Sequence, residues 1–499
     1  MDLLKLSIPT LAKMLREKKI SSQELVSFYL ERIKKHKKLN AYITVLEDAV
    51  NKAKDIDMKG IKNDDPVLRG IPYSLKDNML ADGVKTTCAS RILENYIAGY
   101  DSTIAKRLKD SGAVLLGKTN MDEFAMGSSN ENSHFGPVCN PWNEKHVAGG
   151  SSGGSAVSVS AGLSQFSYGT DTGGSVRLPA SFNGVASLKP TYGRMSRYGI
   201  IAFASSLDQI GPIAKNIEDL AIAYDVVSGH DPKDSTTSIK NKDGMYEYLI
   251  KEVKDRENNF SRKTVGIPRD MLIGGCSKDV LNSLEQSKKV LTDMGFDFVD
   301  IDLPNSKYAL AVYYIIVTGE ASSNLSRYDG VRYGYRTKDY EELKDLYSLS
   351  RGDGFGDEVR RRIILGTFVL SAGYYDAYFS KAAKVRSLIK KDFEKVFEKC
   401  DSILMPVSPV TAFKIGERTK DPLEMYLSDI FTVSANLAAV PSLGFPAGRD
   451  SRGLPIGMQL IGKHFDEKTL FTTAWMIQKQ KPEWFNNIAT TVKEKKVIE

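Results

Sequence analysis

Serine and glycine gather in two neighbouring loops of this chain, and a lysine follows a strand-like segment upstream of them. The loops read GGSSGGS at residues 149–155 and GTDTGGS at residues 169–175, and Lys76 follows the apolar stretch IPYSL. A serine hydroxyl can attack a carbonyl carbon when a base takes its proton. A lysine can act as that base, because burial disfavours the charged ammonium and lowers its pKa. These residue types indicate acyl transfer, with a serine as nucleophile and Lys76 as candidate base.

The second loop also offers groups that can stabilise negative charge. We expect four consecutive backbone N–H groups, those of Thr172, Gly173, Gly174 and Ser175, at a turn that opens a helix. Free N–H groups and the helix dipole at such a turn can hold a developing oxyanion. Asp171 and Arg177 frame the turn, and we interpret both as structural residues that hold the loop.

The elements that position these loops alternate between helices and strands. Residues 1–60 predict helices, with a capping box at Ser21 and Glu24. From about residue 70 the pattern changes: Ser102 can cap a helix that Gly112 ends, and AVLL at 113–116 predicts the next strand. Similar units return at 264–268 and 278–302. This alternation predicts an α/β fold with a central mixed sheet covered by helices on both faces.

No linker forces a division of the chain after its first helices. We therefore expect an N-terminal helical segment at 1–65 and a single domain at 66–485. The polar stretch at about 231–263 predicts a surface excursion from that domain.

Composition excludes several classes of protein. Of 499 residues, 41% are hydrophobic, and no stretch approaches the roughly 18 apolar residues of a membrane-spanning helix. The first residues lack the pattern of a secretory signal, so we expect a location in the cytoplasm or an organelle matrix. The four cysteines are widely separated, which argues against a zinc cluster and predicts no metal site. A net charge of +7 permits a nucleic-acid partner without requiring one.

Residues 112–119 read GAVLLGKT and match the phosphate-loop pattern letter for letter. That motif needs a strand before its first glycine, whereas the segment TIAKRLKDS before Gly112 predicts a helix. The apolar AVLL then occupies the positions where the loop should wrap phosphates. We therefore interpret the match as accidental, and an NTPase remains a rival hypothesis only if the chain binds ATP through Lys118.

Residues 149–154 also match the nucleophile elbow G-x-S-x-G, at Ser151 and at Ser152. That elbow needs a strand before it and a histidine after it. The preceding CNPWNEKHVA does not predict a strand, and the later histidines, His230 and His464, lie in plain polar surroundings. A histidine-based triad is therefore poorly supported.

Together, the segments SLKDN, GGSSGGS and GTDTGGSVR, in this order and spacing, resemble the amidase signature family. The resemblance extends over about residues 66–216 and more loosely to about 480. It implies that Lys76 is the base, Ser151 a bridging serine on a cis peptide, and Ser175 the nucleophile that becomes acylated. It also implies that residues 121–136 form one wall of the pocket, where Met126 and Gly127 contact substrate through backbone atoms.

Three later stretches, at 313–334, 354–378 and 421–448, resemble the A subunits of the aspartyl/glutamyl-tRNA amidotransferases, a branch of that family. The resemblance implies that glutamine is the substrate and that about 304–448 is the substrate-specificity part. Arg362 would bind the α-carboxylate and Asp429 the α-ammonium, with Tyr313 nearby. The register among Arg360, Arg361 and Arg362 stays open.

The same resemblance implies a heterotrimer. Ammonia would pass to a B subunit that uses ATP and magnesium to amidate glutamyl-tRNA or aspartyl-tRNA, and a C subunit would clasp this chain. No cofactor is expected in the chain itself. Leu178 stands where the pattern usually has glutamine, and ANLAAVP differs from the commoner VNLAGVP. Two alternatives remain: a stand-alone amidase of another small amide, and a non-catalytic binding protein, which the intact Lys76, Ser151 and Ser175 make improbable.

Overall fold

The core of the molecule is a large mixed sheet, seen in a computed structural model that describes residues 2–240, 242–253, 263–272, 275–419, 421–485 and 487–489. Among these residues, the sheet has eleven strands in the order β1-β3-β2-β6-β8-β7-β12-β13-β11-β9-β10. The strands are β1 (Tyr42–Val45), β2 (Pro72–Lys76), β3 (Val114–Thr119), β6 (Phe166–Asp171), β7 (Ala186–Lys189), β8 (Gln209–Ala214), β9 (Thr264–Ile267), β10 (Asp297–Asp300), β11 (Ser402–Pro406), β12 (Ser442–Arg449) and β13 (Pro455–Gly462). Strand β2 is parallel to both neighbours, β3 and β6, whereas β6 and β8 are antiparallel. The predicted mixed α/β sheet is therefore confirmed.

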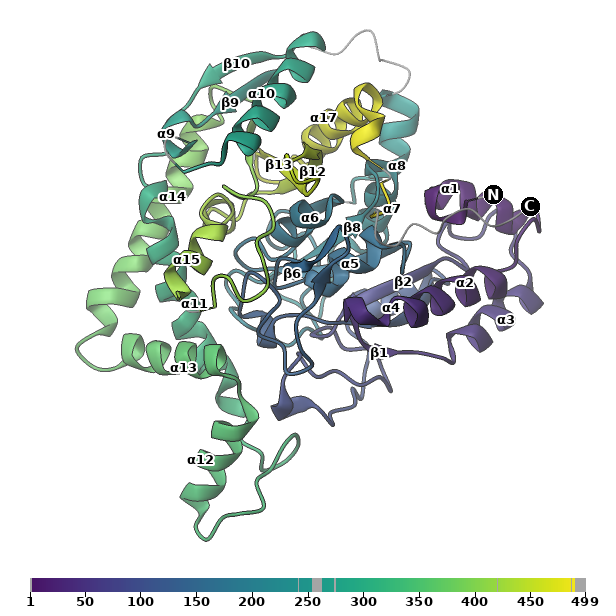
Figure 1. Cartoon of the computed structure of the whole chain (residues 1–499). Helices are drawn as coiled ribbons and strands as arrows, with labels where there is room; N and C mark the ends of the chain where they lie inside the picture. Colours follow the sequence, from purple (N-terminus) through teal and green to yellow (C-terminus); the bar gives the residue numbers. More distant parts are fainter. Residues whose placement is uncertain are drawn as a thin grey trace.

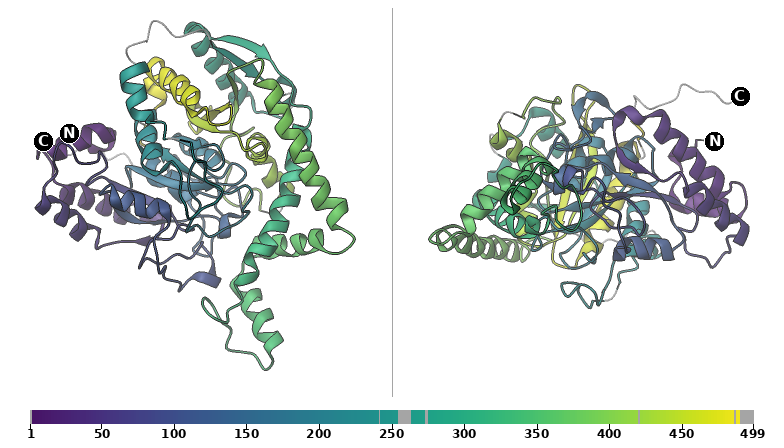
Figure 2. Two further views of the ribbon diagram at one scale, coloured as in Figure 1. Left: turned by 180° about the vertical axis from the view of Figure 1, so that it is seen from behind. Right: turned by 90° about the horizontal axis from the view of Figure 1, so that it is seen from below.

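Helices cover both faces of this sheet (Figures 1 and 2). On one face, Ser74 of β2 is hydrogen-bonded to Ser167 of β6 and to Ser158 of α5. Tyr168 follows Ser167 on β6, and its hydroxyl donates to the Ala223 carbonyl on α7. Successive side chains of a strand point to opposite faces, so α5 and α7 lie on opposite sides. The helices are α1 (Ile8–Arg16), α2 (Ser22–Lys35), α3 (Ala49–Lys59), α4 (Thr103–Asp110), α5 (Gly153–Ser160), α6 (Arg177–Asn183), α7 (Ile217–Val227), α8 (Met245–Tyr248), α9 (Arg269–Leu272), α10 (Lys278–Asp293), α11 (Ala309–Asn324), α12 (Leu343–Gly354), α13 (Asp357–Leu370), α14 (Lys381–Val396), α15 (Pro422–Tyr426), α16 (Val433–Leu437) and α17 (Glu467–Gln480).

Local signals fixed several helix ends as predicted. Ser21 and Glu24 form the capping box of α2, and the Ser102 hydroxyl accepts the Ala105 N–H at 3.2 Å at the start of α4. None of the described helices has both the length and the apolar character needed to cross a bilayer.

The N-terminal region differs from the prediction in one element. Residues 42–45 form β1, an edge strand antiparallel to β3, instead of a helix. The reason is tertiary: YITV is rich in β-branched and aromatic residues, and its backbone groups pair with β3 at Thr119, Lys118 and Gly117. The first helices, coloured purple in Figure 1, are thus tied to the same sheet as the rest of the chain.

The range predicted as a surface excursion begins with packed residues. Asp231, Asp234 and Thr237 are buried, and Asp231 accepts a hydrogen bond from Ser196 at 2.5 Å. Residue 241 and residues 254–262 lie outside the described residues.

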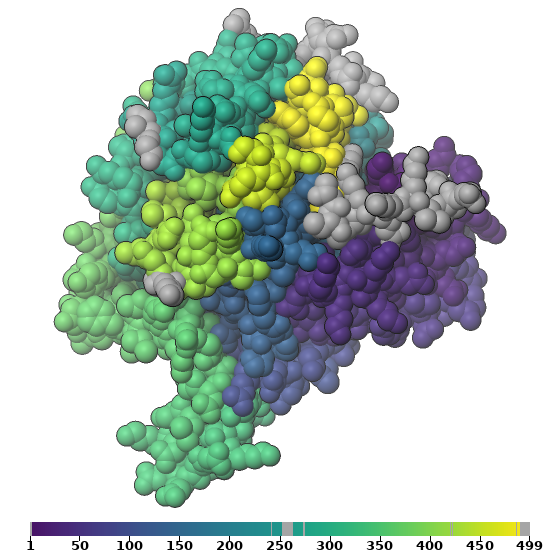
Figure 3. Space-filling view, viewed as in Figure 1, coloured from purple at the N-terminus to yellow at the C-terminus, as the bar shows by residue number. Residues whose placement is uncertain are grey.

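Helices α11 to α14 form a layer beside the sheet, and α12 projects from it as an arm (Figures 1 and 3). Helix α13 crosses α11 very closely, because a Cβ at Gly366 would lie 1.9 Å from the Thr318 carbonyl oxygen. Only glycine allows this approach. At the junction of α12 and α13, Gly354 packs against Ile92 and Gly356 against Glu123.

Candidate active site

Lys76 ends β2, which lies between β3 and β6 in the sheet, and is completely buried. Its Nζ donates to Ser151 Oγ at 2.7 Å and to Ser152 Oγ at 2.8 Å, with the Thr170 carbonyl at 3.4 Å. The structure thus brings the lysine and the first serine loop together. It also adds Ser152, which the sequence offered only as one of two matches to the nucleophile elbow.

Burial lowers the pKa of Lys76 from its ordinary value of 10.5 to about 7. The nearby carboxylates of Asp122, Asp171 and Asp208 act in the opposite direction, but burial outweighs them. A substantial share of Lys76 is therefore neutral at pH 7, and a neutral amine can accept a proton from a serine.

The loop that holds Ser151 is fixed by backbone contacts. The Gly150–Ser151 peptide is cis, as the resemblance implied. The Asp122 N–H donates to the Ser151 carbonyl at 3.1 Å, and a Cβ at Gly150 would lie 1.9 Å from the Asp122 carboxylate. Glycine is therefore required at position 150.

The Ser152 N–H donates to the Ser175 carbonyl at 3.1 Å, which joins the two serine loops. Ser175 is 8% exposed, whereas Ser151 and Ser152 are fully buried. Within the described part of the chain, no hydrogen bond joins the Ser151 and Ser175 hydroxyls. The first link of the expected relay is present in this conformation, and the second is not.

One predicted oxyanion donor is committed elsewhere. The Gly174 N–H donates to Asp171 Oδ1 at 2.8 Å, so it cannot also serve a substrate oxygen. Among the residues that the structure describes, no acceptor is found for the N–H groups of Thr172, Gly173 and Ser175. Gly174 has φ +133°, a conformation that favours glycine, and its N–H is used within the turn itself.

Asp171 and Arg177 hold this turn, as predicted. Arg177 is buried and donates through Nε and Nη2 to the Asp171 carboxylate, at 3.0 and 3.1 Å. It also donates to the Thr432 carbonyl and the Gln459 side chain. Burial alone would raise the pKa of Asp171, but the Arg177 guanidinium lowers it to about 2. The pair is therefore charged at physiological pH.

The three arginines differ in burial. Arg360 and Arg361 are about half exposed and pair with acidic residues on their own helix, whereas the Arg362 side chain is only 3% exposed. Arg362 Nε donates to Glu358 Oε1 at 2.7 Å, and the guanidinium lies 5.2 Å from the Tyr314 ring centroid. Within the described residues its terminal nitrogens have no acceptor, so they can bind a ligand carboxylate.

Asp429, at the end of the short helix η10 (Leu427–Asp429), is buried and accepts the Ser128 hydroxyl at 2.5 Å. Burial raises its pKa to about 7. Tyr313 is also buried, and its ring lies over the turn, because a Cβ at Gly173 would be 2.6 Å from the Tyr313 hydroxyl. Both residues therefore border the region between the serine loops and α13.

A cavity of about 250 Å³ opens beside Arg362. Gly127, Ser129, Glu358 and Arg361 are among its lining residues, together with Tyr426. Met126, which precedes Gly127 in the chain, is fully buried. A Cβ at Gly127 would lie 2.4 Å from the Asp122 carboxylate. The cavity lies on the Arg362 side of the site, because its lining does not include Lys76, Ser151, Ser175, Tyr313 or Asp429.

Several residues of the site were not found from the sequence: Ser128, Ser152, Glu358 and Thr432. Thr432 Oγ1 donates to the Gly173 carbonyl at 2.6 Å. This bond joins residues 429–432 to the turn at residues 172–175. Helical spacing could have identified Glu358, because residues four apart on a helix are neighbours. Nothing in the sequence indicated that Ser128 and Thr432 meet the other segments.

Both accidental motifs are explained by the structure. Lys118 lies within β3, fully buried, 3.3 Å from Asp77, so it is unavailable to a phosphate. The segment before the first serine loop is a small hairpin of β4 (Cys139–Asn140) and β5 (Asn143–Val147), which is a correction to the prediction of no strand there. The hairpin is separate from the main sheet and cannot support a nucleophile elbow.

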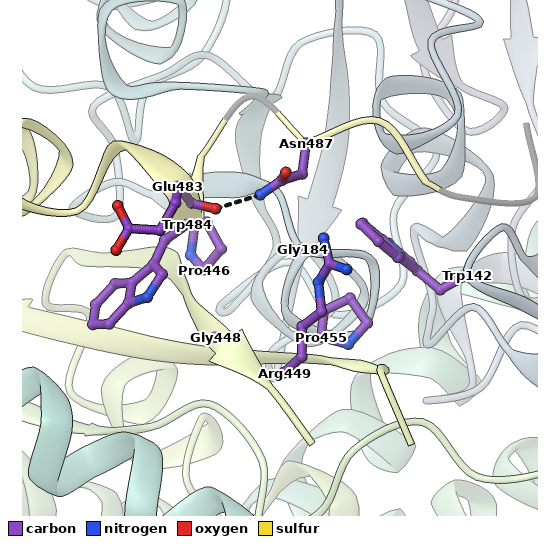
Figure 4. Close-up of a pocket in the computed structure, with 9 residues that line it drawn as sticks. All are labelled: Trp142, Gly184, Pro446, Gly448, Arg449, Pro455, Glu483, Trp484 and Asn487. Carbon is purple, nitrogen blue, oxygen red and sulfur yellow. Dashed lines mark hydrogen bonds between the residues drawn. The ribbon is translucent and has the colours of Figure 1, made fainter. Parts of the chain in front are cut away.

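A second hollow, shown in Figure 4, lies where Trp142, Arg449, Pro455 and Trp484 meet. Its volume is about 30 Å³, and the Arg449 guanidinium stacks 4.1 Å from the Trp142 ring centroid. It shares no lining residue with the cavity at Arg362 and holds no candidate nucleophile. In the described ranges, no group of three or more histidine, cysteine or acidic residues is arranged to bind a metal ion.

Comparison with known proteins defines the class to which this fold and site belong. A family model described as Amidase matches residues 24–471, which is most of the chain. The chain therefore belongs to the amidase family and has the apparatus of an amide-hydrolysing enzyme.

Similar relatives are mostly of one kind, the A subunits of glutamyl-tRNA(Gln) amidotransferases. The one from Thermoanaerobacter pseudethanolicus is 50% identical over 480 residues, which cover 96% of this chain and 97% of that protein. Its counterpart from Persephonella marina is 51% identical, with coverage of 95% and 97%. The solved structure of the Thermotoga maritima counterpart has a TM-score of 0.81 at 41% identity and covers 99% of both chains. Native peptide amidase from Stenotrophomonas maltophilia has a TM-score of 0.79 at 28% identity, with coverage of 95% and 97%.

Proposed function

We propose that this chain is the glutamine-hydrolysing subunit of a tRNA-dependent amidotransferase. One observation supports this above all. Lys76, with a pKa of about 7, is hydrogen-bonded to Ser151 beside the Ser175 turn, and a buried arginine and a buried aspartate border the same region. Lys76, Ser151 and Ser175 suit amide hydrolysis. Arg362 and Asp429 suit the binding of an α-amino acid.

In the proposed reaction, neutral Lys76 takes the proton of Ser151 as Ser151 takes that of Ser175. Ser175 Oγ attacks the side-chain amide carbon of glutamine, and the resulting oxyanion is stabilised by the free N–H groups of the turn. The relay then runs in reverse and protonates the departing ammonia. Water attacks the ester on Ser175 by the same relay and releases glutamate.

Substrate recognition is assigned to charged groups beside the cavity. Arg362 binds the α-carboxylate through its two terminal nitrogens, since its Nε is held by Glu358. Asp429 binds the α-ammonium, and the Tyr313 ring closes the space over the turn. Met126 and Gly127 contribute backbone atoms to the opposite wall.

Ammonia released here serves a partner. We assign the amidation of glutamyl-tRNA or aspartyl-tRNA to a B subunit that holds ATP and magnesium, with a C subunit completing a heterotrimer. The names and coverage of the relatives support this over a stand-alone amidase. Exposed apolar residues on α13 and on η9 (Tyr375–Ser380), such as Ile364, Phe368 and Tyr378, are typical of a surface that contacts another subunit. Four free cysteines fit the reducing cytoplasm.

The test is ammonia release from glutamine by wild type and by Ser175→Ala, each alone and with the B and C subunits. We expect wild-type release to rise in the complex and the variant to be inactive. Activity retained by Ser175→Ala would refute the nucleophile, and a wild type inert toward glutamine in every combination would refute the substrate.

A further inference from the structure

Glu123 is a buried carboxylate that the proposed reaction does not use. It lies in the short helix η4 (Glu123–Ala125) and is 4% exposed. Its Oε2 accepts the Gly356 N–H at 2.9 Å, and its Oε1 is hydrogen-bonded to the Ser90 hydroxyl. Gly356 immediately precedes α13, the helix that bears Arg362. Glu123 therefore connects the N-terminus of this helix directly to residues 121–136, the expected pocket wall.

The junction between α12 and α13 is pressed tightly against Glu123. A Cβ at Gly356 would lie 2.4 Å from Glu123 Oε2, and a Cβ at Gly354 would lie 2.6 Å from Ile92 Cδ1. Between these glycines, Phe355 is buried and its ring meets that of Phe124 at 5.6 Å. The direction in which α13 leaves the core is therefore set at this junction.

Small changes at the junction reach the substrate site. Arg362 is six residues beyond Gly356, so it lies about 9 Å along α13 at about 1.5 Å per residue. A pivot of about 10° at the junction would displace that position by about 1.6 Å, whereas recognition sites need groups placed within about 0.5 Å. Met126 and Gly127, on the opposite wall, follow Glu123 by only three and four residues.

We propose that Glu123 is a positioning residue for substrate recognition, which fixes the N-terminus of α13 to the opposite wall and so places Arg362 for the substrate carboxylate. The inference rests on the proposed function for the identity of that carboxylate. Its geometric part, the attachment of α13, does not depend on the substrate.

The hydrogen-bond pattern indicates which variant should preserve the contact. Burial raises the pKa of Glu123 to about 7. The Ser90 hydroxyl has one proton and lies within hydrogen-bonding distance of both Glu123 and the Gly354 carbonyl, the latter at 3.2 Å. A neutral group at position 123 that donates to Ser90 and accepts from Gly356 satisfies every partner. The amide of Glu123→Gln can do both.

The experiment compares Glu123→Ala and Glu123→Gln with Glu467→Ala in the full chain with its partner subunits. Glu467 is the matched control, because it is also buried and accepts a backbone N–H, that of Thr191 at 2.9 Å, but its helix α17 bears no proposed substrate group. Steady-state rates are measured with glutamine and with butyramide, which lacks both α-groups. Hydrogen–deuterium exchange is measured for residues 357–362.

For Glu123→Ala we expect the KM for glutamine to rise about tenfold or more, with kcat within about twofold and the butyramide KM unchanged. Exchange at 357–362 should increase, and Glu123→Gln should restore both values. Glu467→Ala should change neither. If Glu123→Ala does not fold, Glu123→Asp takes its place, because the shorter side chain cannot reach both partners.

Unchanged exchange at 357–362 in the Ala or Asp variant would overturn the inference, as would a glutamine KM within about twofold of wild type. If Glu467→Ala raised the KM for glutamine equally, the rise in Glu123→Ala would reflect general destabilisation. That result would also overturn the inference. If wild type ignores glutamine, the proposed function fails, but the exchange data still decide whether Glu123 holds α13.

Discussion

In the proposed reaction, the pKa of Lys76 sets the fraction of the enzyme that carries a neutral base at neutral pH. A lysine with the ordinary pKa of 10.5 would be about 0.03% neutral at pH 7, whereas one with a pKa of about 7 is about half neutral, a gain of about 1,600-fold. The shift corresponds to about 5 kcal/mol in favour of the neutral amine. Burial therefore supplies a base that would otherwise be almost absent.

We expect kcat/KM for ammonia release to increase about tenfold per pH unit below pH 7 and to level off above it. Initial rates from about pH 5.5 to about pH 9 measure this rise, the acidic limb of the pH–rate profile. Asp429 also has a pKa of about 7, and its ionisation would affect binding of the α-ammonium. Butyramide has no ammonium, so a limb that persists with butyramide belongs to the catalytic base.

Lys76→Ala should lower kcat by about 10²–10⁴-fold and remove the limb, and Lys76→Arg should be equally inactive because a guanidinium stays charged. A limb centred above about pH 9, or a Lys76→Ala variant within threefold of wild type, would show that Lys76 is not the base.

The other predictions concern stability and recognition. Because the pKa of Lys76 is lower in the folded than in the unfolded chain, burial of its charge costs most below pH 7, so Lys76→Met should raise the melting temperature more at pH 6 than at pH 9. Arg362→Lys should raise the KM for glutamine about 10–100-fold in steady-state assays, whereas Arg361→Lys, at a half-exposed site, should not. Thr432→Val should lower kcat about tenfold with little change in KM, because it removes the 2.6 Å hydrogen bond to the catalytic turn. Arg177→Met leaves the Asp171 carboxylate buried without its partner and should cost about 3–5 kcal/mol in denaturant unfolding.

Local sequence signals predicted the elements whose form depends on their own residues. The cap at Ser102 and the capping box of α2 are examples, because donor and acceptor lie within a few residues. The strand at 42–45 was missed because four residues carry too little periodicity, and their structure depends on pairing with β3, about 70 residues later.

The candidate site shows the same division. Lys76, Ser151 and Ser175, the proposed reactive residues, could be singled out because the segments SLKDN, GGSSGGS and GTDTGGSVR resemble the family's motifs. The commitment of the Gly174 N–H to Asp171 could not be predicted, since it depends on side-chain orientation. The choice of Arg362 among three arginines could have been made from helix periodicity, as Val359, Gly366 and Val369 share its buried face.

The partners of Arg177 have a consequence for the synthesis of the protein. Thr432, Asn436 and Gln459, which hold this guanidinium together with Asp171, follow it by 255 to 282 residues. While the ribosome is making the middle of the chain, the turn that contains Ser175 lacks these three partners, and all three are available only after β13 has emerged. A nascent or prematurely terminated chain is thus expected to release no ammonia, so that amide hydrolysis begins only once nearly the whole polypeptide has been made.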